Sequence, residues 1–143
     1  MGSGPVDLLL LDTHVWIWLV NGGPEPLQAG AADAIRRASA GSALAVSAIS
    51  VWEVAMLEAK GRLQLQMDCL EWVSEATRRS GVRILPLSPE IAVASTRLPG
   101  EWHGDPADRI IAATARHESA ALVTRDRALL AYAGQGYLRA IEA

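Results

Sequence analysis

Cysteine is nearly absent from this chain. Cys69 is its one cysteine, so no internal disulfide can form, and we expect a small buried apolar residue in a protein of the reducing cytoplasm. No apolar run approaches the roughly 18 to 20 residues that span a bilayer, and the N-terminus lacks the basic stretch of a signal peptide. We therefore expect no membrane partner.

Patterns of histidine, cysteine or glycine that bind zinc or dinucleotides are also missing. His14, His103 and His117 are scattered, without the spacing of a zinc site, and no G-x-G-x-x-G links a strand to a helix. The chain has 13 Lys and Arg against 16 Asp and Glu, for a net charge of -3. Any contact with nucleic acid must therefore be local, for instance through a basic rim of Arg36, Arg37, Arg78, Arg79 and Arg97.

The chain does contain a regular alternation of strand-like and helix-like segments. Apolar runs of strand length lie at 6–11, 43–47, 82–87 and 121–126, with a last edge strand expected at 137–141. Capping residues and helical periodicity predict helices at 13–20, 30–40, 48–60, 69–80, 88–98, 105–119 and 127–133. This alternation predicts an α/β sandwich with a mainly parallel sheet covered on both faces.

The length of 143 residues, half of them hydrophobic, suits one core. We expect a single domain over residues 6–143, with residues 1–5 a disordered N-terminus or a cloning remnant.

Acidic residues recur where these segments end. Asp12 and Asp126 each end an apolar run, Glu53 lies in the first turns of the helix at 48–60, and Asp105 and Asp108 open the helix at 105–119. Ligand-binding residues of open parallel sheets collect beyond the carboxyl ends of the strands. These acids can therefore meet at one edge of the sheet if their strands are neighbours.

Each acid alone also has a structural explanation. Asp12, Asp105 and Asp126 each precede a helix that they could cap, Asp108 would gain from the helix dipole, and Glu53 could be solvated. Capping does not explain why acids recur at the same end of successive units. Two carboxylates about 5 Å apart repel by roughly 3 kcal/mol at an effective dielectric near 20. A bound Mg²⁺ relieves that repulsion and keeps several of its waters, and Mn²⁺ favours the same ligands. A cation held in this way can activate water for the hydrolysis of a phosphodiester bond.

Four stretches together resemble a known family. DTHVWIW, SAISVWE, HGDPADRIIAATA and LVTRD are similar to the four acidic motifs of PIN-domain ribonucleases, in the branch that contains the VapC toxins of bacterial toxin–antitoxin pairs, and the likeness spans residues 8–141. The resemblance implies that the family's acids fall on Asp12, Glu53, Asp108 and Asp126. Asp12 and Asp108 would bind Mg²⁺ most directly, and Asp105 matches an extra acid with a supporting or capping role.

The resemblance also implies a three-layer α/β/α fold and a metal-dependent endoribonuclease that leaves 5′-phosphate and 3′-hydroxyl ends on RNA. A homodimer and an antitoxin whose C-terminal segment lies across the groove are implied as partners. Ser47 and Thr124 match hydroxyl residues that orient carboxylates or water. Arg109 and Arg125, each next to a predicted ligand, would meet RNA phosphates or pair with the acids.

Aromatic residues flank two of the acids. Trp16, Trp18 and Trp52 could stack on RNA bases, but core packing or partner binding explains such tryptophans more often. His14 follows Asp12 by two positions, yet metal-activated water needs no histidine base.

Two other functions remain open at this point. A phosphoreceiver or an aspartate-dependent phosphatase also places an Asp after a buried strand, although His14 stands where that phosphatase needs a second Asp and the single lysine, Lys60, is badly placed for a receiver. A non-catalytic module that binds a protein partner is the other alternative.

Overall fold

The computed structural model describes residues 7–102 and 104–143, so the expectations for residues 1–5 and for His103 lie outside the described chain. Each connection between successive strands contains one or two helices, as predicted. In chain order they are β1 Leu9–Leu11, α1 Thr13–Asn21, α2 Ala29–Ala40, β2 Leu44–Ser47, α3 Ala48–Ala59, α4 Cys69–Ser80, β3 Arg83–Leu85, α5 Pro89–Ala94, α6 Pro106–His117, β4 Ala121–Thr124, α7 Arg127–Gly134 and β5 Arg139–Glu142.

The five strands form one parallel sheet in the order β3-β2-β1-β4-β5. Its edge strand β5 falls where the sequence predicted one, at 137–141. Leu11 of β1 is level with Val46 of β2 and with Val123 of β4. The residues that follow, Asp12, Ser47 and Thr124, are therefore level at the carboxyl edge. The strand order changes direction between β1 and β4, which is the switch point where open α/β sheets bind ligands.

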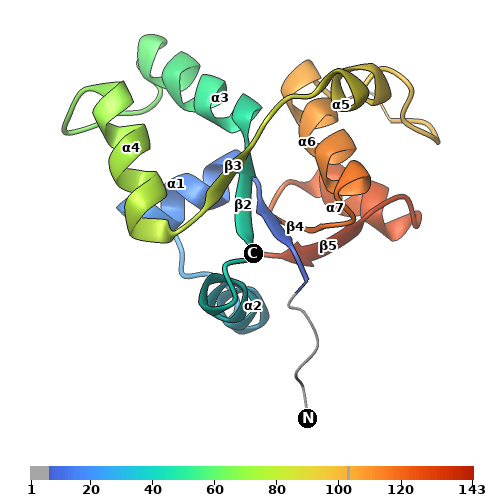
Figure 1. The fold of residues 1–143 in the computed structure, drawn as a ribbon, viewed down its shortest axis with the longest axis horizontal. Coiled ribbons are helices and arrows are strands. Elements are labelled where there is room, and N and C mark those ends of the chain that lie inside the picture. The colour runs from blue at the N-terminus through green and yellow to red at the C-terminus, as the bar shows by residue number, and fades with distance from the viewer. Residues whose placement is uncertain (1–6, 103) are drawn as a thin grey trace.

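Helices cover both faces of the sheet, which confirms the predicted three-layer fold (Figure 1). Strand residues alternate between the faces, because successive side chains of a strand point in opposite directions. Leu9 and Leu11 pack with residues of α1, α2 and α4, whereas Leu10 packs with α6 and α7. All three leucines are buried, so β1 lies at the centre of two apolar layers and delivers the residue after it to the middle of the sheet edge.

Local sequence signals set several element bounds as expected. Asp68 caps α4 by accepting a hydrogen bond from the Leu70 amide at 3.0 Å, and Gly81 ends it in the left-handed conformation with φ of 71°.

Among the described residues, no helix has the length and hydropathy needed to cross a bilayer.

Several elements are shorter than predicted. The strand expected over residues 82–87 spans only Arg83–Leu85, because Pro86 has no amide hydrogen to donate to a neighbouring strand, and the strand expected over 121–126 ends at Thr124. The helix expected to reach residue 98 ends at Ala94, because the hydroxyls of Ser95 and Thr96 donate to carbonyls of the preceding turn, at 2.7 Å each. Such local bonds compete with helix propagation. The first strand was expected over residues 6–11 and begins at Leu9, after an exposed Asp7.

Candidate active site

The predicted acids converge on one pocket at the switch point of the sheet. This pocket, called the acidic pocket below, has a volume of about 390 Å³. It is lined by Asp12, His14, Val15, Trp18, Glu53, Asp105, Asp108, Arg125 and Asp126. All four acids predicted as metal ligands, and the supporting acid Asp105, are in that set. Their metal-binding roles stay predictions, since the structure shows only their placement.

Asp12 lies at the bottom of the pocket, with 7% of its surface exposed. Its Oδ1 accepts a hydrogen bond from the Thr13 amide at 2.8 Å, and its Oδ2 accepts one from the Thr124 hydroxyl at 2.7 Å. Burial raises the pKa of the Asp12 carboxyl, the two hydrogen bonds lower it in part, and the nearby charge of Asp126 raises it. Each oxygen is fixed in direction and retains capacity for one more partner.

Glu53 reaches the pocket from α3 and is held by Thr13. The Thr13 hydroxyl donates to Glu53 Oε1 at 2.5 Å and contacts the Ser50 hydroxyl at 2.7 Å. Since the one hydroxyl hydrogen of Thr13 goes to Glu53, Ser50 must donate in the second contact. Burial raises the pKa of Glu53, the bond from Thr13 lowers it, and the charges of Asp12 and Asp105 raise it further.

Sequence reasoning missed Thr13, which joins two predicted ligands. Its amide holds Asp12 and its hydroxyl holds Glu53, 40 positions away, and its side chain is 1% exposed. The available signal was a hydroxyl residue directly after the strand-ending acid, in a run that is otherwise apolar apart from His14.

Asp108 is the third acid of the pocket whose pKa is raised. It projects from the first turn of α6 and is half-buried. Burial and the charges of the four other carboxylates, Asp105, Asp12, Asp126 and Glu53, raise the pKa of Asp108 from 3.8 to about 7. At neutral pH the five carboxylates of the pocket therefore cannot all be ionised without a cost in free energy. A bound cation would reduce that cost.

Three acids have the capping role that was weighed for them. Asp12 caps α1 through the bond from the Thr13 amide described above. Asp105 Oδ1 accepts from the Asp108 amide at 2.8 Å and so begins α6. Asp126 Oδ1 accepts from the amides of Ala128 and Leu129, at 2.7 and 3.3 Å, and so begins α7. All three still face the acidic pocket, so capping and a role in the pocket do not exclude each other.

The two predicted hydroxyl residues differ in what they contact. Thr124 donates to Asp12 and accepts from the Asp126 amide at 3.0 Å, so it orients one carboxylate and the backbone that carries another. Ser47 instead caps α3 by accepting from the Ile49 amide at 3.1 Å, and it forms no hydrogen bond with a carboxylate among the described residues.

The Arg109 side chain forms no ion pair with the acids among the described residues, and it does not line the acidic pocket. It donates from Nε to the Ser95 carbonyl at 2.9 Å and from Nη1 to the Trp102 carbonyl at 3.0 Å. These bonds fasten the segment that leads into Asp105. Arg125 does line the pocket, but it pairs with none of the acids among the described ion pairs.

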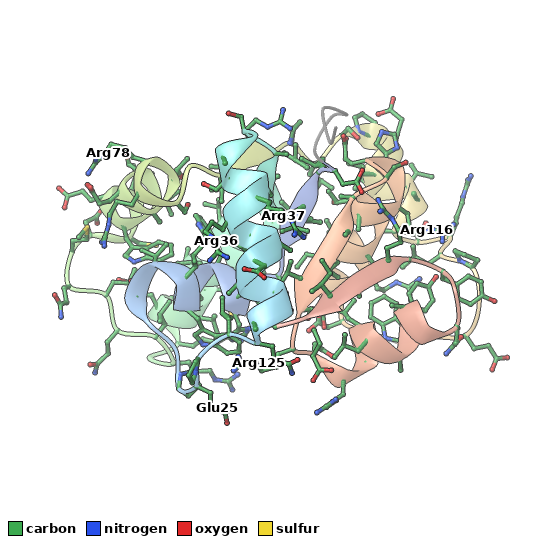
Figure 2. The ribbon with its side chains drawn as sticks, turned by 90° about the horizontal axis from the view of Figure 1, so that it is seen from below. Glu25, Arg36, Arg37, Arg78, Arg116 and Arg125 are labelled. Atoms are coloured by element: carbon green, nitrogen blue, oxygen red, sulfur yellow. The ribbon has the colours of Figure 1, made fainter. Side chains whose placement is uncertain are left out.

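The expected basic rim does not form around the acidic pocket. None of the five arginines named for it lines that pocket. Figure 2 shows Arg36 and Arg37 on α2 and Arg78 on α4, apart from Arg125.

The three tryptophans near the acids have different environments. Trp16 is fully buried and packs edge-on against Trp72 at 5.1 Å, Trp18 lines the acidic pocket, and Trp52 is 56% exposed. Only Trp18 of these three is placed to contact a ligand in the pocket.

The donor set fits a hard divalent cation. Within the described residues, no three acidic, histidine or cysteine side chains are close enough to hold one ion together. A magnesium site does not require such a cluster, because Mg²⁺ uses one or two carboxylates directly and keeps several waters. All the candidate ligands are carboxylate oxygens, which is the chemistry that Mg²⁺ and Mn²⁺ prefer.

Comparison with known proteins gives consistent matches. The PIN domain family profile matches residues 9–135. Ribonuclease VapC22 of Mycobacterium tuberculosis is 40% identical over 121 residues, which cover 85% of this chain and 88% of that relative.

The fold is also similar to solved structures. VapBC2 from Rickettsia felis, bound to a DNA fragment from its promoter, has a TM-score of 0.67 and 17% identity, covering 94% of this chain and 98% of that chain. DNA-bound VapBC from Salmonella typhimurium has a TM-score of 0.67 and 18% identity, covering 94% and 97%.

Proposed function

The chain belongs to the PIN-domain family, in its VapC branch, and from this premise we propose that it is a metal-dependent endoribonuclease that acts as the toxin of a toxin–antitoxin pair. One observation carries the proposal: five carboxylates from four separate parts of the chain face one pocket, where burial and their mutual repulsion raise the pKa of Asp108 to about 7. The similarity to Ribonuclease VapC22 supports RNA as the substrate.

In the proposed site, four acids bind the cation and two threonines position them. Asp12 and Asp108 bind the cation most directly, and Glu53 and Asp126 complete the site through water or a second ion. Thr124 and Thr13 hold Asp12 and Glu53 in place through the hydrogen bonds described above. When bound, Mg²⁺ polarises a phosphoryl oxygen and makes water a better nucleophile at neutral pH. No histidine base is required, and His14 has no assigned step.

The partners follow from the same premise. Complexes of VapB with VapC are among the similar structures, so we propose a cognate antitoxin whose C-terminal segment covers the acidic pocket. We further propose a homodimer. Its interface would use exposed apolar residues of α3, of β3, of α5 and of the segment between β3 and α5, because such side chains lose contact with water when a second copy covers them. They are Trp52, Ile84, Leu87 and Val93, each between 41% and 56% exposed.

The decisive experiment compares wild type with Asp12→Asn. We expect wild type to cleave RNA with Mg²⁺ or Mn²⁺, to stop when a chelator is added, and to arrest growth on expression. Asp12→Asn should fold, keep its melting temperature and lose both effects. Asp33→Asn is the matched control, since Asp33 lies in an exposed pair with Arg36. Equal cleavage by wild type and Asp12→Asn would reject the assigned site, and cleavage that persists in chelator would reject metal dependence.

A further inference from the structure

One wall of the acidic pocket is not acidic. His14, Trp18 and Arg125 line it together, facing the same space as the five carboxylates. The Arg125 guanidinium lies over the Trp18 ring, 4.6 Å from its centroid, and the His14 and Trp18 ring centroids are 5.9 Å apart. Figure 2 shows Arg125 beside the segment of Glu25, and its Nη2 donates to the Pro26 carbonyl at 3.3 Å.

Arg125 is held in place by main-chain oxygens and an indole ring, and not by the acids that line the pocket. Its Nε donates to the Ala143 carbonyl at 3.0 Å, and no ion pair of the described residues includes it. A guanidinium normally gains most from a carboxylate, through charge-assisted bonds. Here main-chain oxygens of Ala143 and Pro26 and the Trp18 indole fix the side chain, and among the described residues no Asp or Glu of the pocket pairs with it. Nη1 has no hydrogen-bond partner among the described residues.

A cation placed in this way fits an anion that enters from outside. The acids of the pocket repel an RNA backbone except where a cation binds, so a fixed positive charge at the rim offsets that repulsion for the neighbouring phosphate. The planar groups add a second attraction, because unpaired bases stack on aromatic rings and on guanidinium planes. Bases within a duplex are already stacked and paired, so they cannot use such a surface.

Building on the proposed ribonuclease function, we propose that Arg125 and Trp18 form a subsite for one nucleotide of single-stranded RNA, next to the phosphate that is cleaved. Arg125 Nη1 donates to a phosphate oxygen, and the stacked guanidinium and indole contact the adjoining base. The Arg125 bonds to Ala143 and Pro26 pre-organise the subsite, which reduces the cost of ordering a long side chain on binding.

The chain offers a matched control on the other side of Asp126. Arg127 begins α7, its side chain is 84% exposed, and its contact with Glu142, at 3.6 Å, is a surface pair. Arg127 does not line the acidic pocket. Arg125→Ala and Arg127→Ala therefore remove the same charge two positions apart, inside and outside the proposed subsite.

The test measures RNA binding without cleavage. The Asp108→Asn variant, with chelator present, is titrated against a short fluorescent single-stranded oligoribonucleotide and against an RNA duplex, at several salt concentrations. In this background, Arg125→Ala should weaken binding of the single strand about tenfold and reduce the slope of log K against log salt by about 0.7, the value for one lost phosphate contact on a single strand. Arg127→Ala should change neither value.

Variants at the same positions separate stacking from charge. Trp18→Leu should weaken single-strand binding about fivefold without changing the salt slope, and Trp18→Phe should restore most of the loss. Arg125→Lys should keep the salt slope but lose part of the affinity, because it retains charge without the plane. Melting temperatures check that each variant is folded. If Arg125→Ala does not fold, the comparison is made with Arg125→Lys instead.

Several outcomes would overturn the subsite. Equal binding by the two arginine variants would do so, as would a loss of affinity that is the same for duplex and single strand. If Arg125→Ala weakened binding of a protein antitoxin but not of RNA, the surface would belong to that partner. The proposed function is tested separately by wild-type cleavage: if wild type cleaves RNA while the arginine variants bind alike, only the subsite is wrong, and if wild type neither binds nor cleaves RNA, both are.

Discussion

The acidic pocket differs sharply from a second hollow near α1, which we call the apolar groove. The groove is larger, about 540 Å³ against 390 Å³, and no acidic residue lines it. Its lining residues are Leu19, Val20, Leu27, Ala32, Ile35, Arg36, Ser39, Ala40, Leu44, Arg79 and Ser80. By size and apolar lining alone, the groove is the better candidate for a ligand site.

Chemistry, rather than size, separates the two regions. The side chains that line the groove are mostly apolar. No carboxylate lies among them, so no negative charge there needs a cation. The acidic pocket brings together groups that repel one another, and burial raises the pKa of three of them, Asp12, Glu53 and Asp108. A fold keeps such a conflict only at a cost in stability, which indicates a function for the residues concerned. Variants in the two regions should therefore affect activity and stability in opposite ways.

The largest expected effect is the loss of activity in Asp108→Asn. We expect RNA cleavage to fall by at least about a hundredfold, because the variant removes a proposed ligand of the cation. The free energy of unfolding, measured in chelator at pH 8, should stay the same or rise, because one of the mutually repelling charges is gone. Denaturant unfolding and a cleavage assay on the same preparation check both parts. A variant that lost stability and activity together would mean that Asp108 is structural.

A core variant beside the groove should give the opposite result. Ile35 lies on the buried face of α2, is 6% exposed and packs in the apolar core. We expect Ile35→Ala to reduce the free energy of unfolding by about 2 to 3 kcal/mol, through lost burial and the cavity left behind. Cleavage at a temperature where the variant is folded should match that of wild type. If instead cleavage by the folded variant fell as far as in Asp108→Asn, the contrast between the two regions would fail.

A smaller effect is expected at Thr13, which supports the acids without lining the pocket. Thr13→Val keeps the shape of the side chain but removes the bond to Glu53, so we expect cleavage to fall about tenfold. Thr13→Ser retains the hydroxyl and should recover most of the activity. The fall should appear in kcat more than in KM, because Glu53 would lose its orientation while the RNA surface stays intact. Equal activity of the Val and Ser variants would show that the hydroxyl is not needed.

The sequence predicted the acids better than it predicted what holds them. Asp12 and Asp126 follow apolar strands, and Asp105 and Asp108 follow helix-start signals, so local pattern was sufficient to find them. These acids lie close together only because β1 lies between β2 and β4 in the sheet. That strand order cannot be predicted from local sequence patterns. The role of Thr13 depends on α3 packing beside α1.

Arginine roles were the least predictable part of the site. Arg109 and Arg125 are both next to an acid in sequence, yet one fastens a loop and the other lies over Trp18 in the pocket. Long side chains can reach many partners, so adjacency along the chain does not choose among them. The positions of Trp102 and Ser95, whose carbonyls Arg109 binds, are set by tertiary packing.

The smallest effect is a pH dependence of stability, and its sign separates the two regions once more. The pKa of Asp108 is about 7 in the fold and near 3.8 when unfolded, so between these values the folded state binds more protons. Stability must then fall as pH rises through that window. We expect the melting temperature in chelator to drop by a few degrees from pH 5 to pH 8, and Mg²⁺ to restore more of it at pH 8 than at pH 5. Asp108→Asn should flatten the profile, whereas Ile35→Ala should lower it at every pH without changing its slope. A wild-type profile that rises over this range would show that the carboxylates of the pocket are not in conflict.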